Sequence, residues 1–125
     1  MENTEIIFER RSNERFPVKQ GVYALLKNGA SKLGQIKNVS KGGLAFMYIN
    51  GGEQMHGSLL LDIFLSGYGF YLKDIPCNKI SDIHVENKSS FSDFKMGHLG
   101  VQFSELSHDQ SNRLDTFIQN YTISI

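Results

Sequence analysis

Apolar and polar residues alternate along most of the chain, which is typical of half-buried β-strands. The first alternating segment runs from Phe16 to Leu26 and is broken only by Gln20. Glycine-containing turns separate the segments. Further strands are predicted at Lys32–Lys37, Leu44–Ile49, Leu59–Leu65, Phe70–Leu72, Ile75–Val85 and Leu99–Phe103. The strand from Ile75 shifts its apolar register between Cys77 and Ile83, which indicates a β-bulge.

The pattern changes to helical spacing after Ser104. Its apolar positions are Leu106, Leu114, Phe117, Ile118 and Tyr121. The segment Ser107–Gln110 has the form of a capping box, which favours a helix start at this point. We therefore expect an all-β fold: a small antiparallel barrel of six or seven strands, with one C-terminal helix over an open end or a face of the core.

The 125 residues suit a single domain, and 40 % of them are hydrophobic, which is enough for a core. Residues 1–15 are polar and charged, so we interpret them as a flexible arm that leads into a barrel domain at 16–125. The lone Cys77 forms no intramolecular disulfide, and neither an export signal nor a membrane-spanning segment is visible. We expect a soluble, cytoplasmic protein.

Charge is balanced overall but uneven along the chain. Thirteen basic residues match thirteen acidic ones, which argues against a long nucleic acid or an anionic membrane as partner. Residues 10–41, however, hold eight basic side chains and one acidic one, Glu14. This concentration of positive charge points to a small anionic partner.

Two motifs lie within this basic segment. Arg11 and Arg15 form R-x-x-x-R, and the planar guanidinium fork suits phosphate oxygens and the guanine edge. Asn38, Ser40 and Gly43 form N-x-S-x-x-G, which offers an amide, a hydroxyl and close approach to the backbone. Each motif alone is also explained without a ligand, as a solvated arm and as a hairpin turn.

The pair of motifs, in this order and spacing, resembles the PilZ domain family. The doubled Arg10-Arg11 and the strand Leu99–Phe103 followed by a helix extend the resemblance. It implies a PilZ-type barrel that binds the bacterial second messenger cyclic di-GMP. The residues that it implies as ligand contacts are Arg10, Arg11, Arg15, Asn38, Ser40, Gly42 and Gly43. Asn38 stands where Asp is more frequent and keeps the acceptor oxygen, and a side chain at position 43 is expected to occupy ligand space.

No catalytic constellation is visible in the sequence. His56, His84, His98 and His108 lack metal-ligand spacing, and Cys77 has no nearby second ligand. Ser40 lies in no nucleophile elbow, and Gly52–Ser58 lacks the lysine of a phosphate loop. We expect no enzyme activity, no metal and no resident cofactor.

The resemblance implies a receptor that changes conformation and so regulates an unidentified protein partner in motility, biofilm or exopolysaccharide formation, or virulence. One alternative is a PilZ-like adaptor that binds a protein and no nucleotide. Another is a single-stranded nucleic-acid binder in which Phe16, Tyr23 and Phe46 stack on bases.

Overall fold

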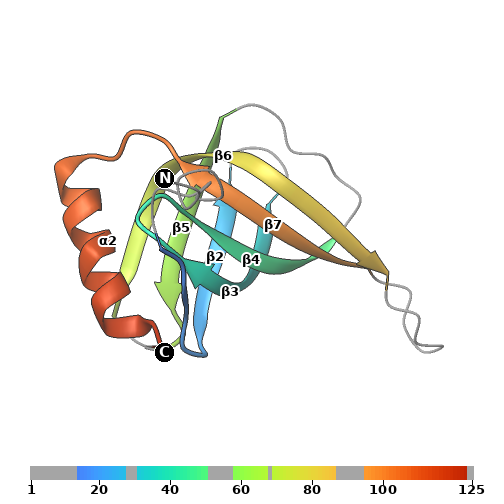
Figure 1. Cartoon of the computed structure of the whole chain (residues 1–125), viewed down its shortest axis with the longest axis horizontal. Helices are drawn as coiled ribbons and strands as arrows, with labels where there is room; N and C mark the ends of the chain where they lie inside the picture. The colour runs from blue at the N-terminus through green and yellow to red at the C-terminus, as the bar shows by residue number, and fades with distance from the viewer. Residues whose placement is uncertain (1–13, 28–30, 51–57, 68, 87–94, 124–125) are drawn as a thin grey trace, which may run out of the picture.

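A computed structural model describes residues 14–27, 31–50, 58–67, 69–86 and 95–123. The elements within these ranges are seven strands and one helix (Figure 1). They are β1 (Phe16–Pro17), β2 (Val22–Lys27), β3 (Lys32–Val39), β4 (Gly43–Asn50), β5 (Leu59–Leu65), β6 (Tyr71–Glu86), β7 (Lys95–Phe103) and α2 (His108–Tyr121).

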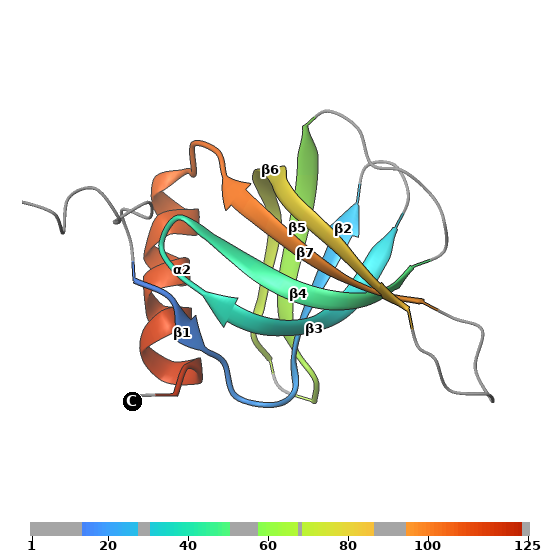
Figure 2. The same cartoon turned by 45° about the vertical axis from the view of Figure 1, so that its right-hand side comes forward.

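Six of the strands close into an antiparallel barrel. Their order is β3-β2-β5-β6-β7-β4, and β4 pairs back onto β3. β1 is an additional short strand that pairs with the C-terminal end of β3. Figure 2 shows β1 near the end of β3 and beside α2. The expected all-β barrel with one C-terminal helix is confirmed.

Two strand boundaries differ from the prediction. The segment predicted as one strand from Phe16 to Leu26 is divided into β1 and β2, because the chain turns at Gln20-Gly21, where Gly21 has a φ of 86°. The two segments predicted on either side of Asp74 are one strand, β6, which passes through Asp74 with a φ of 60°. The bulge predicted between Cys77 and Ile83 is confirmed as a register shift between Lys79 and Ser81.

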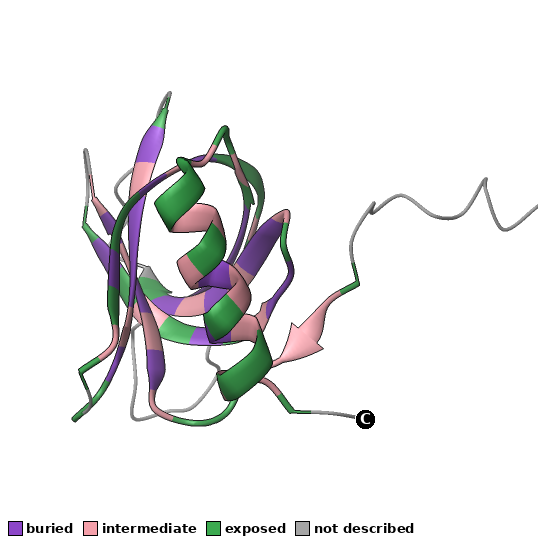
Figure 3. Cartoon of the chain, turned by 90° about the vertical axis from the view of Figure 1, so that its left-hand side faces the viewer, coloured by how far each residue is buried: buried purple, intermediate pink, exposed green. Residues whose placement is uncertain are grey.

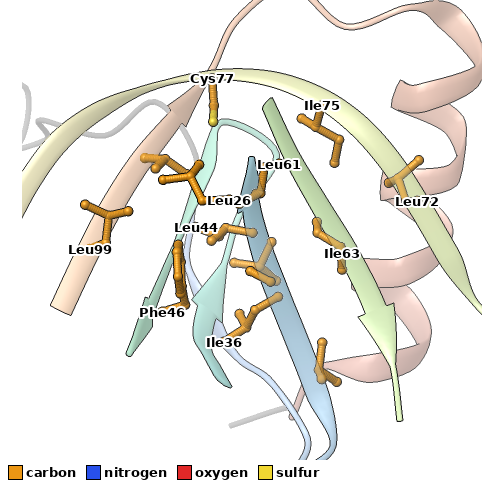
Figure 4. Packing of buried hydrophobic residues seen from close by; sticks show 14 of the residues in the cluster. Leu26, Ile36, Leu44, Phe46, Leu61, Ile63, Leu72, Ile75, Cys77 and Leu99 are labelled. Carbon is orange, nitrogen blue, oxygen red and sulfur yellow. The ribbon is translucent and has the colours of Figure 1, made fainter. Parts of the chain in front are cut away.

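The barrel interior is filled by the inward side chains of all six strands. Leu26, Ile63, Leu99 and Cys77 are among the buried residues (Figure 4). Phe46 has 0 % exposure. The interpretation of Phe46 as a base-stacking platform is therefore wrong, because its ring belongs to the core.

Helix α2 begins as the sequence predicts and lies against one end of the barrel (Figure 3). Ser107 Oγ accepts a hydrogen bond from the Gln110 amide, and the Gln110 side chain accepts one from the Ser107 amide. The helix buries Leu114 and Phe117, and the Phe117 ring lies 5.4 Å from that of Phe70, centroid to centroid. Within the described ranges no helix has the length and apolar character needed to cross a membrane.

Candidate functional site

A β-bulge in β3 brings the side chain of Asn38 to the outside of the barrel. Ile36 pairs with Phe46 and Asn38 with Ala45, so Lys37 is an extra residue with no partner position on β4. Ile36 and Val39 are consequently both buried although they are three residues apart. The two polar residues between them, Lys37 and Asn38, remain accessible on the surface.

The same end of β3 is where β1 pairs. Pro17 lies opposite Asn38, and Phe16 lies opposite Val39. Arg15 comes immediately before this strand, and its Nη1 donates a hydrogen bond to Asn38 Oδ1 at 2.9 Å. One residue from each sequence motif therefore contacts the other directly, across 23 positions of the chain.

The turn that follows β3 is held together from within. The Ser40 amide donates to the Gly43 carbonyl at 2.8 Å, and Ser40 Oγ accepts from the Gly42 amide at 3.1 Å. The Gly42 carbonyl accepts a hydrogen bond from the Phe103 amide at 2.8 Å, which ties the turn to the end of β7. Ser40 is only 4 % exposed, so it shapes the turn.

Gly43 is required by the packing of β4 against β7. A Cβ at this position lies 2.2 Å from the Val101 carbonyl oxygen, which is backbone and cannot move aside easily. The sequence led us to expect ligand in this space, but the neighbour on that side is the protein itself.

β1 and the residues that follow it are held on the other side by the C-terminal end of α2 and the residues after the helix. The Pro17 carbonyl accepts from the Ile123 amide at 2.8 Å, and the Lys19 amide donates to the Tyr121 carbonyl at 2.9 Å. Lys19 Nζ also donates to the Asn120 carbonyl at 3.2 Å. The segment that carries Arg15 into the barrel is thus fixed between β3 and the C-terminal end of the helix.

An ion pair joins the turn after β3 to α2. Lys41 Nζ lies 3.1 Å from Asp115 Oδ1, and the two side chains are 60 % and 38 % exposed. We call Arg15, Asn38, Ser40 and Lys41 the motif cluster. The predicted ligand contacts include neither Lys41 nor Asp115, although Lys41 lies inside the second motif and is one of the eight basic residues in the segment 10–41.

Five predicted site residues therefore lie close together at the end of β3 and in the turn that follows it: Arg15, Asn38, Ser40, Gly42 and Gly43. Ser40 and Gly43 are buried there. Arg10 and Arg11 lie outside the described residues, as does most of the predicted arm. No group of three or more histidine, cysteine or acidic side chains that could hold a metal occurs in the part of the chain that the structure describes.

A second polar cluster lies on β2, β5 and β6, and we call it the carboxylate cluster. Asp62, at 2 % exposure, accepts hydrogen bonds from Tyr71 Oη at 2.6 Å and from the Asp74 amide at 2.9 Å. Lys27 Nζ lies 3.0 Å from Asp62 and 2.6 Å from Asp74. Burial alone would raise the pKa of Asp62, but these hydrogen bonds and the lysine outweigh it, so the pKa is lowered. The sequence showed Asp62 only as a break in an apolar strand.

A comparison with known protein families gives a match that covers both motifs. The model of the PilZ domain matches residues 9–120, which is most of the chain and includes both motifs. The chain belongs to the PilZ domain family. No curated protein matches it.

Solved PilZ structures share the fold at low sequence identity. The PilZ domain of Escherichia coli YcgR, solved with c-di-GMP, superposes with a TM-score of 0.67 at 14 % identity, over 88 % of this chain and 89 % of that one. The K. pneumonia MrkH–c-di-GMP complex gives 0.66 at 22 % identity, over 89 % of this chain and 52 % of MrkH. Bacillus subtilis MotI/DgrA, an inhibitor of motility, gives 0.56 at 18 % identity, over 86 % and 48 %. This chain therefore spans about half the length of MrkH and MotI/DgrA.

Proposed function

We propose that this PilZ domain is a receptor for cyclic di-GMP, which binds at the motif cluster and is released unchanged. The hydrogen bond from Arg15 to Asn38 carries the proposal, because it joins the two motifs into one surface. The YcgR and MrkH structures, both solved with c-di-GMP, support the choice of ligand.

The chemistry of the surface suits this ligand. Cyclic di-GMP is a dianion with two guanine bases, and guanidinium groups bind both phosphate oxygens and the O6/N7 edge of guanine. In the proposal, Arg10, Arg11 and Arg15 supply these contacts, while Asn38 offers an amide to a base or phosphate. Ser40, Gly42 and Gly43 hold the turn in the shape that the ligand meets.

The output of such a receptor is conformational. Residues 1–15 become ordered over the ligand, and the changed surface is read by a protein partner in the bacterial cytoplasm. β1 connects this arm to the C-terminal end of α2 through the Pro17–Ile123 hydrogen bond. No catalytic step is needed.

The test is calorimetric titration of the full chain with cyclic di-GMP. We expect one saturable binding event for the wild type and affinity lower by about tenfold or more in Arg11→Ala and in Arg15→Ala, the size of one lost charge-assisted hydrogen bond. GMP serves as the ligand control. A wild type that does not bind, or arginine variants that bind as the wild type does, would contradict the proposal; the first result would favour an adaptor without nucleotide.

A further inference from the structure

Lys41 lies at the most exposed point of the turn in the motif cluster. The hydrogen bonds of Ser40 and Gly42 on either side of it fix its backbone, while its side chain is 60 % exposed. Its ammonium group contacts the carboxylate of Asp115 on α2 at 3.1 Å. A fixed backbone and a flexible four-carbon stem allow this ammonium to change partner without moving the turn.

The partner of Lys41 is itself charged. Lys19 Nζ contacts a backbone carbonyl, whereas Lys41 Nζ contacts a carboxylate. An arriving dianion therefore competes with a negative charge at Lys41. Since both side chains of the pair are well exposed, water and salt screen their attraction and the pair is easily broken.

We propose that Lys41 is a further ligand-binding residue that exchanges Asp115 for a phosphate of the ligand. The inference rests on the proposed function, because it adds a contact to the same dianion. Asp115 acts as a competitor: it holds Lys41 in the ligand-free protein and is released on binding.

The exchange changes what α2 presents to a partner. Gln110 and Arg113 tie the first half of the helix to β6, with 2.9 Å from Gln110 Nε2 to the Asp74 carbonyl and 2.6 Å from Arg113 Nη2 to the Tyr71 carbonyl. The Lys41–Asp115 pair joins the middle of the helix to the turn. When the ligand takes Lys41, this tie is lost and the Asp115 carboxylate becomes available on the helix surface.

A double-mutant cycle tests the exchange. Cyclic di-GMP is titrated into the wild type, Lys41→Gln, Asp115→Asn and the double variant by calorimetry. We expect Lys41→Gln to lower the affinity by about tenfold and Asp115→Asn to raise it by about threefold, the size of an exposed ion pair. In the Lys41→Gln background Asp115→Asn should have no effect, since the competition no longer exists.

Matched control variants distinguish a direct contact between Lys41 and the ligand from a general effect of the protein's charge on affinity. Asp109→Asn removes one negative charge from the same helix, and Lys73→Gln removes one exposed lysine from β6; we expect little change from either. Thermal melts check that all variants fold. Equal gains from Asp115→Asn in both backgrounds, or equal effects of Lys41→Gln and Lys73→Gln, would overturn the inference. If the wild type binds and Arg15→Ala does not, while Lys41→Gln binds normally, the inference fails and the proposed function stands.

Discussion

The motif cluster and the carboxylate cluster are both polar groups on the outside of one barrel, but their contacts differ in kind. In the carboxylate cluster, buried Asp62 receives three donors and Lys27 lies between two carboxylates. In the motif cluster, Arg15 contacts an amide and Lys41 contacts a half-exposed carboxylate. The first arrangement surrounds a buried carboxylate, whereas the second joins side chains of Arg15, Asn38 and Lys41 that remain at least partly accessible to solvent.

This difference in contacts indicates that one cluster contributes mainly to stability and the other mainly to ligand binding. A buried, fully hydrogen-bonded carboxylate costs stability when one partner is removed, because the remaining groups lose their compensation. Basic groups that water can reach add little to stability. They form strong charge-assisted hydrogen bonds when an anionic ligand binds. The carboxylate cluster should therefore govern folding, and the motif cluster should govern binding.

Asp62→Ala is the change with the largest expected effect. It leaves Tyr71, the Asp74 amide and Lys27 without their shared acceptor, so we expect the free energy of unfolding to fall by about 3 kcal/mol. Urea denaturation followed by circular dichroism measures this. Asp109→Ala, at an exposed position on α2, is the control and should change stability by less than about 0.5 kcal/mol. An Asp62→Ala protein as stable as the control would remove the contrast between the clusters.

Gly43→Ala should affect both stability and binding. The added Cβ meets the Val101 carbonyl oxygen at 2.2 Å, so β4 and the turn must shift away from β7, at about 2 kcal/mol. Gly69→Ala is the matched control, since a Cβ there meets nothing within 4 Å. The same urea experiment compares them, and cyclic di-GMP titration tests whether the shifted turn loses affinity. Equal stability of the two variants would contradict the steric account.

Arg15→Ala reverses the pattern expected for Asp62→Ala. We expect an affinity loss of about tenfold or more, and a stability loss smaller than the roughly 3 kcal/mol expected for Asp62→Ala, because the Arg15 side chain is only partly buried. Arg15→Lys keeps the charge but not the planar fork, so it should restore only part of the affinity. A stability loss in Arg15→Ala as large as that in Asp62→Ala would contradict this division, because the motif cluster would then also contribute to folding.

The smallest expected effect is the dependence of stability on acid. The pKa of Asp62 is lowered in the folded protein, so its contribution to stability is complete above its unfolded value and is lost as the pH falls through the folded value. The wild type should therefore lose stability below about pH 4. Asp62→Asn should show a shallower loss over the same range, measured by urea denaturation at several pH values. Parallel curves would exclude Asp62 as a source of the acid sensitivity.

The sequence predicted the barrel, the helix and the motif turn because each depends on local patterns. Alternation in β2 to β7 and the Ser107–Gln110 capping box are visible in consecutive residues. Resemblance alone implied that Arg15 and Asn38 belong to one ligand site. Their hydrogen bond was not predicted, and its geometry depends on the bulge at Lys37. In the sequence, this bulge is indicated only by the two polar residues, Lys37 and Asn38, between the apolar residues Ile36 and Val39.

The features that the sequence did not reveal depend on contacts between distant residues. The buried carboxylate of Asp62 is compensated by Lys27 and Tyr71, which contact it only after β2, β5 and β6 have paired. Asp74 adopts a positive φ without a glycine to indicate it. Lys41 and Asp115 come together only when α2 lies against the barrel end.

Amide chemical-shift mapping by NMR, with cyclic di-GMP titrated into the isotope-labelled chain, tests the central claim most directly. The account predicts that the largest shifts occur at Arg15 and across Asn38–Gly43, with small shifts at Asp62 and Asp74. Shifts confined to the carboxylate cluster, or a titration that leaves Asn38–Gly43 unchanged, would contradict it.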